Sequence, residues 1–203
     1  MLHTTFKKAK EAGACIRSYR KMAKALGGVE KYGLDTPIPL DEVLEVCGLD
    51  DALWALRIIL EPADREIRLF TCDCAERVLF LYEEKYPQDK RPRVAIETAR
   101  RYADGQATAR ELAIAEAIAW AAAGAAPGAA PWAIAEAVAG AAAWTAARAA
   151  PWAIAEAVAW AIAEAVTRAV AEVAPGAVAE VAAWVAEKEW QKARLIELLK
   201  EVG

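Results

Sequence analysis

From about Leu112 to Lys188, charged, aromatic and glycine residues recur at every fourth position, and Ala, Val, Ile and Pro fill nearly all the positions between. The marked positions are Trp120, Gly124, Gly128, Trp132, Glu136, Gly140, Trp144, Arg148, Trp152, Glu156, Trp160, Glu164, Arg168, Glu172, Gly176, Glu180, Trp184 and Lys188. Four residues advance an α-helix by about 400°. Each marked side chain is therefore rotated by about 40° around the helix axis relative to the one before it. The pattern therefore predicts helices whose marked side chains either spiral around straight axes or stay aligned along a right-handed superhelix.

The sequence also repeats with a longer period of 20 residues. The string APWAIAEAVA occurs at Ala130–Ala139 and again at Ala150–Ala159, and LAIAEAIA at Leu112–Ala119 is a third, related copy. Pro131 and Pro151 precede successive units, which leaves two architectures open. One is an antiparallel bundle or solenoid of short Ala-rich helices that turn near the prolines, and the other is one long, kinked and coiled helix. A compact form that buries its tryptophans is favoured, because an isolated helix could not bury them.

Apolar residues at steps of three and four also predict helices before the repeat. These are Thr4–Leu26, Leu40–Cys47, Ala52–Leu60, a segment from Pro62 to about Tyr86, and Arg93–Ala103. Thr108 and Glu111 then have the spacing of a capping box at the start of the repeat. No segment alternates as a strand does, so we expect an all-α fold without a sheet. The pattern divides the chain into an N-terminal helical domain (1–107), the repeat (108–188) and a C-terminal helix end (189–203) that packs on the rest.

Composition narrows the class of partner. The 203 residues are 57% hydrophobic, and the formal net charge is −4. Met1–Glu111 is neutral, so the remainder of the chain carries this negative charge. Nucleic-acid-binding proteins normally show a basic stripe, so we expect no nucleic acid as partner. The uncharged run Ala117–Ala135 is long enough to raise the question of a membrane span, but glycines and prolines interrupt it and most of the rest is alanine, so we expect none.

The four cysteines are Cys15, Cys47, Cys72 and Cys74. Lysines between positions 7 and 10 interrupt any apolar secretory segment near the start. These two observations favour a cytoplasmic protein with free, buried thiols over a disulfide framework.

The sequence contains few candidate catalytic or metal-binding residues. Cys72 and Cys74 are two residues apart, and on a helix their thiols would point to opposite faces, so core packing is favoured over metal binding. His3, the single histidine, lies in a terminus that we expect to be frayed. The carboxylates of Asp64–Glu76 resemble a solvated helix face paired with nearby arginines. We therefore expect no catalytic, cofactor or metal site, and no enzyme.

Several blocks flanking the repeat resemble a family of immunity proteins of bacterial polymorphic toxin systems, whose members also occur in mobile elements. The blocks are LHTTFKKAKEAGAC (Leu2–Cys15), YRKMAKALGGVEKYG (Tyr19–Gly33), GLDDALWALR (Gly48–Arg57), RLFTCDCAERVL (Arg68–Leu79), KYPQDKRPRVAIETARRYADGQAT (Lys85–Thr108) and EKEWQKARLIELL (Glu187–Leu199). The resemblance implies toxin neutralisation and brings no catalytic residues. The repeat departs from the family pattern, since it is more regular, more acidic and richer in Pro. Both a natural variant and an engineered repeat fit it.

The leading hypothesis is a non-enzymatic protein that binds and neutralises a bacterial toxin. Tryptophan and arginine anchor protein interfaces, and acidic side chains suit a basic partner. The candidate contacts are Trp132, Glu136, Trp144, Trp152, Glu156, Trp160 and Glu164. The alternative is a structural scaffold that self-associates through its Ala-rich faces into a homo-oligomer.

Overall fold

The computed structural model describes residues 1–125, 151–173 and 176–202. Within this part the helices are joined by turns and loops, and one pair of two-residue strands is the only sheet, which confirms the all-α class. The chain divides into two compact units, Met1–Ala63 with Lys192–Gly203, and Asp64–Gln191. The division at 107 and 188 by sequence pattern stays a prediction.

The first unit is built from short elements around a core of Leu2, Phe6, Leu40, Leu44, Leu53 and Leu56. Its elements are β1 (His3–Thr4), α1 (Phe6–Glu11), α2 (Ile16–Ala25), α3 (Val29–Tyr32), β2 (Ile38–Pro39), α4 (Leu40–Cys47), α5 (Leu49–Ala55) and the 3₁₀ turn η1 (Leu56–Ile58). The C-terminal end of α11 (Ala177–Glu201) also belongs to this unit, and its Leu195, Leu198 and Leu199 are buried. The Met1 ammonium donates a hydrogen bond to the Val202 carbonyl at 3.0 Å.

The predicted helix Thr4–Leu26 is wrong at both its start and its middle. Thr4 lies in β1, which pairs antiparallel with β2, and the Thr5 hydroxyl accepts a hydrogen bond from the Lys8 amide to cap α1. The helix then breaks at Gly13, whose φ of 74° is the left-handed conformation that glycine adopts without steric cost. The expectation of no sheet is also wrong, because a strand of two residues is too short to show alternation.

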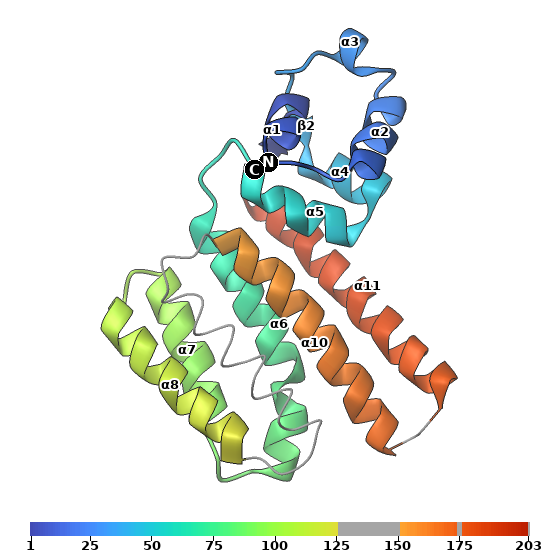
Figure 1. Cartoon of the computed structure of the whole chain (residues 1–203). Coiled ribbons are helices and arrows are strands. Elements are labelled where there is room, and N and C mark those ends of the chain that lie inside the picture. The colour runs from blue at the N-terminus through green and yellow to red at the C-terminus, as the bar shows by residue number, and fades with distance from the viewer. Residues whose placement is uncertain (126–150, 174–175, 203) are drawn as a thin grey trace. The chain divides into compact units, whose positions relative to one another are not determined.

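The second unit is a row of helices in the order α8 (Ala109–Ala125), α7 (Arg91–Ala103), α6 (Asp64–Lys85), α10 (Pro151–Val173) and the first part of α11 (Figure 1). Helix α6 lies in the middle and is buried along most of its length, including Cys72 and Cys74 as the core reading predicts. The Thr108–Glu111 capping box forms reciprocally: the Thr108 amide donates to Glu111 Oε2 at 2.7 Å and the Glu111 amide to Thr108 Oγ1 at 3.2 Å.

The described Ala-rich helices pack through small side chains, and Trp120 and Trp160 are largely exposed. In α10, Ala159, Ile162, Ala163 and Ala165 are fully buried, and small side chains on this face let α10 approach α6 closely. Trp120 of α8 is 41% exposed and Trp160 of α10 is 55% exposed, so the expectation of buried tryptophans is wrong for these two. The repeat between 126 and 150, and with it the choice between the two predicted architectures, lies outside the described residues. Of the helices that the structure describes, none is long and apolar enough to cross a membrane.

Candidate functional site

Two of the seven predicted partner contacts have described side chains, and both lie on α10. Trp160 is exposed, and Glu164 forms an ion pair with Arg168 one turn further on. Trp152 and Glu156 belong to the first two turns of the same helix, but their side chains lie outside the described part. The other three predicted contacts, Trp132, Glu136 and Trp144, also lie outside it.

Trp160 lies against a second aromatic side chain, which comes from α11. The Trp160 and Trp184 rings meet edge to face, with centroids 6.4 Å apart and planes at 78°. The Lys188 ammonium lies 5.4 Å from the centroid of Trp184, within cation–π range. Because aromatic pairs prefer this T-shaped arrangement, each ring holds the other in one orientation.

Exposed valines extend this surface along α11. Val181 is 61% exposed and Val185 51%, and with Trp184 and Lys188 they occupy helical positions three and four apart, which share one face. We call Trp160, Val181, Trp184, Val185 and Lys188 the tryptophan patch. Such an apolar surface with one cation can bury substantial area against a partner, since a single tryptophan contributes about 150–250 Å².

Sequence reasoning found Trp160 but missed the α11 half of the patch. Trp184 and Lys188 both occupy marked positions of the four-residue pattern, so the pattern contained the signal. The pattern does not show which helices lie side by side. Twenty-four residues separate Trp160 from Trp184 in the sequence, and only the packing of α10 beside α11 brings the two rings together.

The carboxylates of Asp64–Glu76 are engaged in ion pairs between helices. Arg100 of α7 contacts Asp73 at 2.7 Å and Glu76 at 2.6 Å. Arg65 contacts Asp104 at 2.6 Å. Arg65 also lies 3.5 Å from Glu66, so one pairing within α6 forms as the sequence suggests. The other contacts reach α7 and Asp104 at its end, because the two helices run antiparallel. The carboxylates therefore hold the two helices together.

His3 is ordered, not frayed as expected. Its Nδ1 lies 2.7 Å from Glu61 Oε1, and its backbone amide donates to Glu61 Oε2 at 2.7 Å. Burial works against ionisation of Glu61, but the hydrogen bonds from the His3 backbone and ring outweigh it and lower the pKa of Glu61. This pair fixes β1 in place, so His3 has a structural role.

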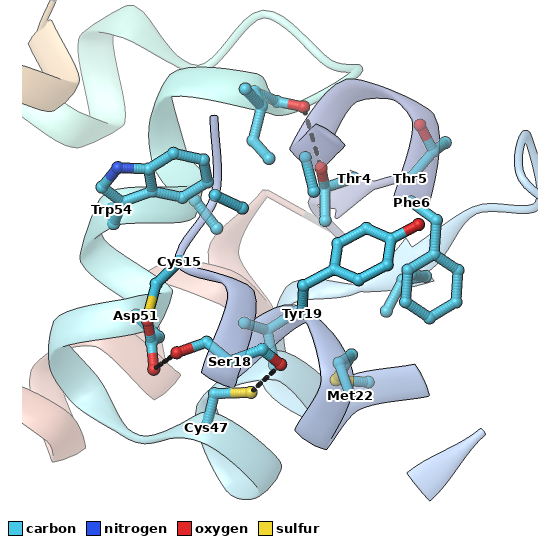
Figure 2. Close-up of a pocket in the computed structure, with 16 residues that line it drawn as sticks. Thr4, Thr5, Phe6, Cys15, Ser18, Tyr19, Met22, Cys47, Asp51 and Trp54 are labelled. Carbon is cyan, nitrogen blue, oxygen red and sulfur yellow. Dashed lines mark hydrogen bonds between the residues drawn. The ribbon is translucent and has the colours of Figure 1, made fainter. Parts of the chain in front are cut away.

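A small cavity of about 60 Å³ lies in the first unit, with almost wholly apolar walls that include Phe6, Tyr19 and Met22. Figure 2 shows Ser18 between Asp51 and Cys47 at its edge: the Ser18 hydroxyl donates to Asp51 Oδ2 at 2.8 Å, and the Cys47 thiol donates to the Ser18 carbonyl at 3.6 Å. A volume of this kind has room for a few water molecules, but the apolar walls offer them few hydrogen-bond partners.

Comparison with protein families identifies the class. A family model described as "Imm-5 like putative immunity protein" matches residues 59–197, which is more than two thirds of the chain. The chain therefore belongs to this family. The match includes the whole repeat, and it ends in the last turns of α11. Comparison with curated proteins and with solved structures finds no match.

Proposed function

We propose that this protein is a non-enzymatic immunity protein that neutralises a bacterial toxin by binding it through the tryptophan patch. Membership of the immunity-protein family supports binding to a toxin in general terms. The observation that supports this particular surface is the edge-to-face pair of Trp160, which is 55% exposed, and Trp184, which is partly buried on the adjacent helix. An exposed tryptophan held in place by a second ring is the kind of anchor that dominates the binding energy of protein interfaces.

The charge distribution supports a protein partner over a nucleic acid. The basic side chains of Lys90–Arg93 and Arg100–Arg101 have acidic neighbours: Arg91 contacts Asp89 at 2.6 Å and Arg93 contacts Glu83 at 2.5 Å. Arg101 lies 3.5 Å from Glu111. These pairs leave little unbalanced positive charge for phosphate. The acidic repeat would instead attract a basic toxin and accelerate its association.

We place this encounter in the cytoplasm. All four cysteines are free thiols, which suits a reducing compartment. The predicted contacts Trp132, Glu136, Trp144, Trp152 and Glu156 remain part of the proposal as an extension of the same surface along the repeat.

A growth assay tests this function. The product of the gene adjoining that of the protein is expressed in a bacterial host with and without the protein, and we expect toxicity that co-expression of the wild-type protein relieves. Replacing both Trp160 and Trp184 by alanine should remove the protection. Ile114→Ala, which removes an exposed apolar side chain from α8, is the matched control and should protect fully. Protection by the double variant would exclude the patch as the toxin contact.

Self-association is the second candidate function, because the same exposed valines and tryptophans would serve a homo-oligomer. Val178, which is 85% exposed, extends the apolar stripe of α11 and would lie in such an interface. Light scattering over a hundredfold range of protein concentration distinguishes self-association from toxin binding. A constant monomer mass would reject the scaffold, whereas a wild-type dimer that the Trp160→Ala variant does not form would support it.

A further inference from the structure

A second concave feature lies in the helical row and shares no residue with the tryptophan patch. The cavity measures about 430 Å³ and is bounded by α6, α10 and α11. Six of its eight lining residues are apolar: Val78, Phe80, Leu81, Val166, Ala169 and Val170. The other two are Arg77 and Glu187. A cavity of this size with mostly apolar walls and few polar groups is typical of small-molecule sites.

One carboxylate, that of Glu187, lies on the cavity wall, and Gln191 lies beside it on α11. Glu187 is 3% exposed and accepts a hydrogen bond from Gln191 Nε2 at 3.2 Å. Gln191 is fully buried, and the same nitrogen donates to the Ala159 carbonyl at 2.8 Å, which fixes the orientation of the amide. Within the described part of the chain, Gln191 Oε1 has no hydrogen-bond partner. A buried carboxylate is costly unless donors satisfy it, so a ligand in the cavity that brings a donor to Glu187 would relieve the cost.

The electrostatics of Glu187 point to a cationic donor. Burial raises its pKa, and the hydrogen bond from Gln191 and the charges of Arg77 and Lys188 act in the opposite direction without cancelling the effect. The Arg77 side chain is exposed, and its guanidinium carbon lies over the Trp190 ring, 5.5 Å from the centroid. The Arg77 guanidinium is therefore stacked on an aromatic ring, and its charge acts on Glu187 without forming an ion pair with it that the structure records.

We propose that this cavity binds a small aliphatic primary amine. The alkyl stem would lie against Leu81, Val166 and Val170, and the ammonium would donate hydrogen bonds to the Glu187 carboxylate. A plain hydrocarbon would fill the same walls but bring no hydrogen-bond donor to the buried carboxylate. A ligand carboxylate would place like charge beside Glu187. The inference does not depend on toxin binding.

An NMR titration with three ligands of equal length tests the site. Hexylamine, 1-hexanol and hexanoate are added separately to the ¹⁵N-labelled full chain at pH 7. We expect saturable shifts for hexylamine at the amides of residues 77–81, 166–170 and 187, with weaker binding of hexanol and the weakest of hexanoate. Binding of hexanoate as tight as that of hexylamine, or the absence of saturation with hexylamine, would overturn the assignment.

Two variants separate the carboxylate from the walls. Glu187→Gln keeps the shape and removes the charge, and we expect it to weaken hexylamine binding about tenfold or more while binding of hexanol changes little. Glu189→Gln, at an exposed position on the same helix, is the matched control and should bind like the wild type. Ala169→Phe should fill the cavity and abolish binding of all three ligands without loss of helical signal. Unchanged hexylamine binding by Glu187→Gln would also contradict the proposal.

Discussion

Cys15 differs from the other three cysteines in both exposure and hydrogen bonding. It is exposed at the start of α2. Hydrogen bonds from the backbone amides of Ser18 and Arg17 and from the Ser18 hydroxyl lower the pKa of its thiol. Burial raises the pKa of Cys47, and it raises that of Cys72 to about 12. The thiolate is the reactive form, so the four side chains should differ strongly in reactivity.

We therefore expect iodoacetamide at pH 7.5 to alkylate Cys15 first in the folded protein, at least tenfold faster than Cys47, with Cys72 and Cys74 unmodified. Peptide mass spectrometry of samples quenched over time measures each rate. In urea all four rates should converge. Modification of Cys72 or Cys74 at the rate of Cys15 in native protein would contradict the burial of α6.

Asp89 makes stability depend on pH. Hydrogen bonds from the Arg91 side chain and from Tyr82 outweigh the effect of burial and hold its pKa well below the usual range. Burial, together with the hydrogen bond to Asp89, raises the pKa of Tyr82 to about 12. A depressed carboxyl pKa means that the folded state favours the ionised form. This stabilisation is fully present above the unfolded pKa of about 3.9 and is lost as the pH falls toward the folded value.

We expect Asp89→Asn to lower the free energy of unfolding by about 1.5 kcal/mol at pH 7, because it removes charge-assisted hydrogen bonds. The difference from wild type should shrink between pH 4 and pH 2. Urea unfolding followed by circular dichroism at several pH values gives both quantities. A deficit that stays constant down to pH 2 would mean that the ionised carboxylate is not what stabilises the loop.

At the scale of single elements, local signals in the sequence predict the helices that have them. Leu40–Cys47 is α4 as predicted, and Pro92, the second residue of α7, suits the first turn of a helix. The break at Gly13 was missed because the apolar spacing continues from α1 into α2, so periodicity alone reads both as one helix. The pairing of His3 with Pro39 was missed because it joins distant segments through backbone hydrogen bonds.

The capping box gives the element-scale prediction. Thr108→Ala removes the side-chain acceptor for the Glu111 amide, and we expect a loss of about 1 kcal/mol in stability. Thr108→Ser keeps the hydroxyl and is the matched control. Urea unfolding at pH 7 measures both, and equal stability of the alanine and serine variants would show that the cap contributes nothing.

At the scale of the whole chain, the first unit is assembled from both ends of the sequence. Leu195 and Leu198 are fully buried, although more than 130 residues separate them from the rest of that unit's core. No local pattern encodes this association, and for the same reason the sequence could not pair Trp160 with Trp184. The all-α class and the family can be recognised from individual segments of the sequence. The tryptophan patch and the cavity depend on how the helices pack against one another, which no single segment specifies.

Leu198→Ala should therefore destabilise the first unit by about 3 kcal/mol, the typical cost of a buried leucine truncation. Lys200→Ala, at an exposed position two residues away, should be neutral. Amide hydrogen exchange locates the effect, and we expect faster exchange in α4 and α5. Loss of protection confined to residues 192–202 would contradict the assignment of this segment to the unit.

The central claim is that Trp160 and Trp184 form the anchor for a toxin. Isothermal titration calorimetry between the purified protein and the purified product of the adjoining gene tests it most directly. The account predicts a one-to-one complex with the wild type, and for the Trp160→Ala, Trp184→Ala variant a loss of about 2 kcal/mol or more, which is about thirtyfold in Kd. Equal affinity of the wild type and the double variant would contradict it.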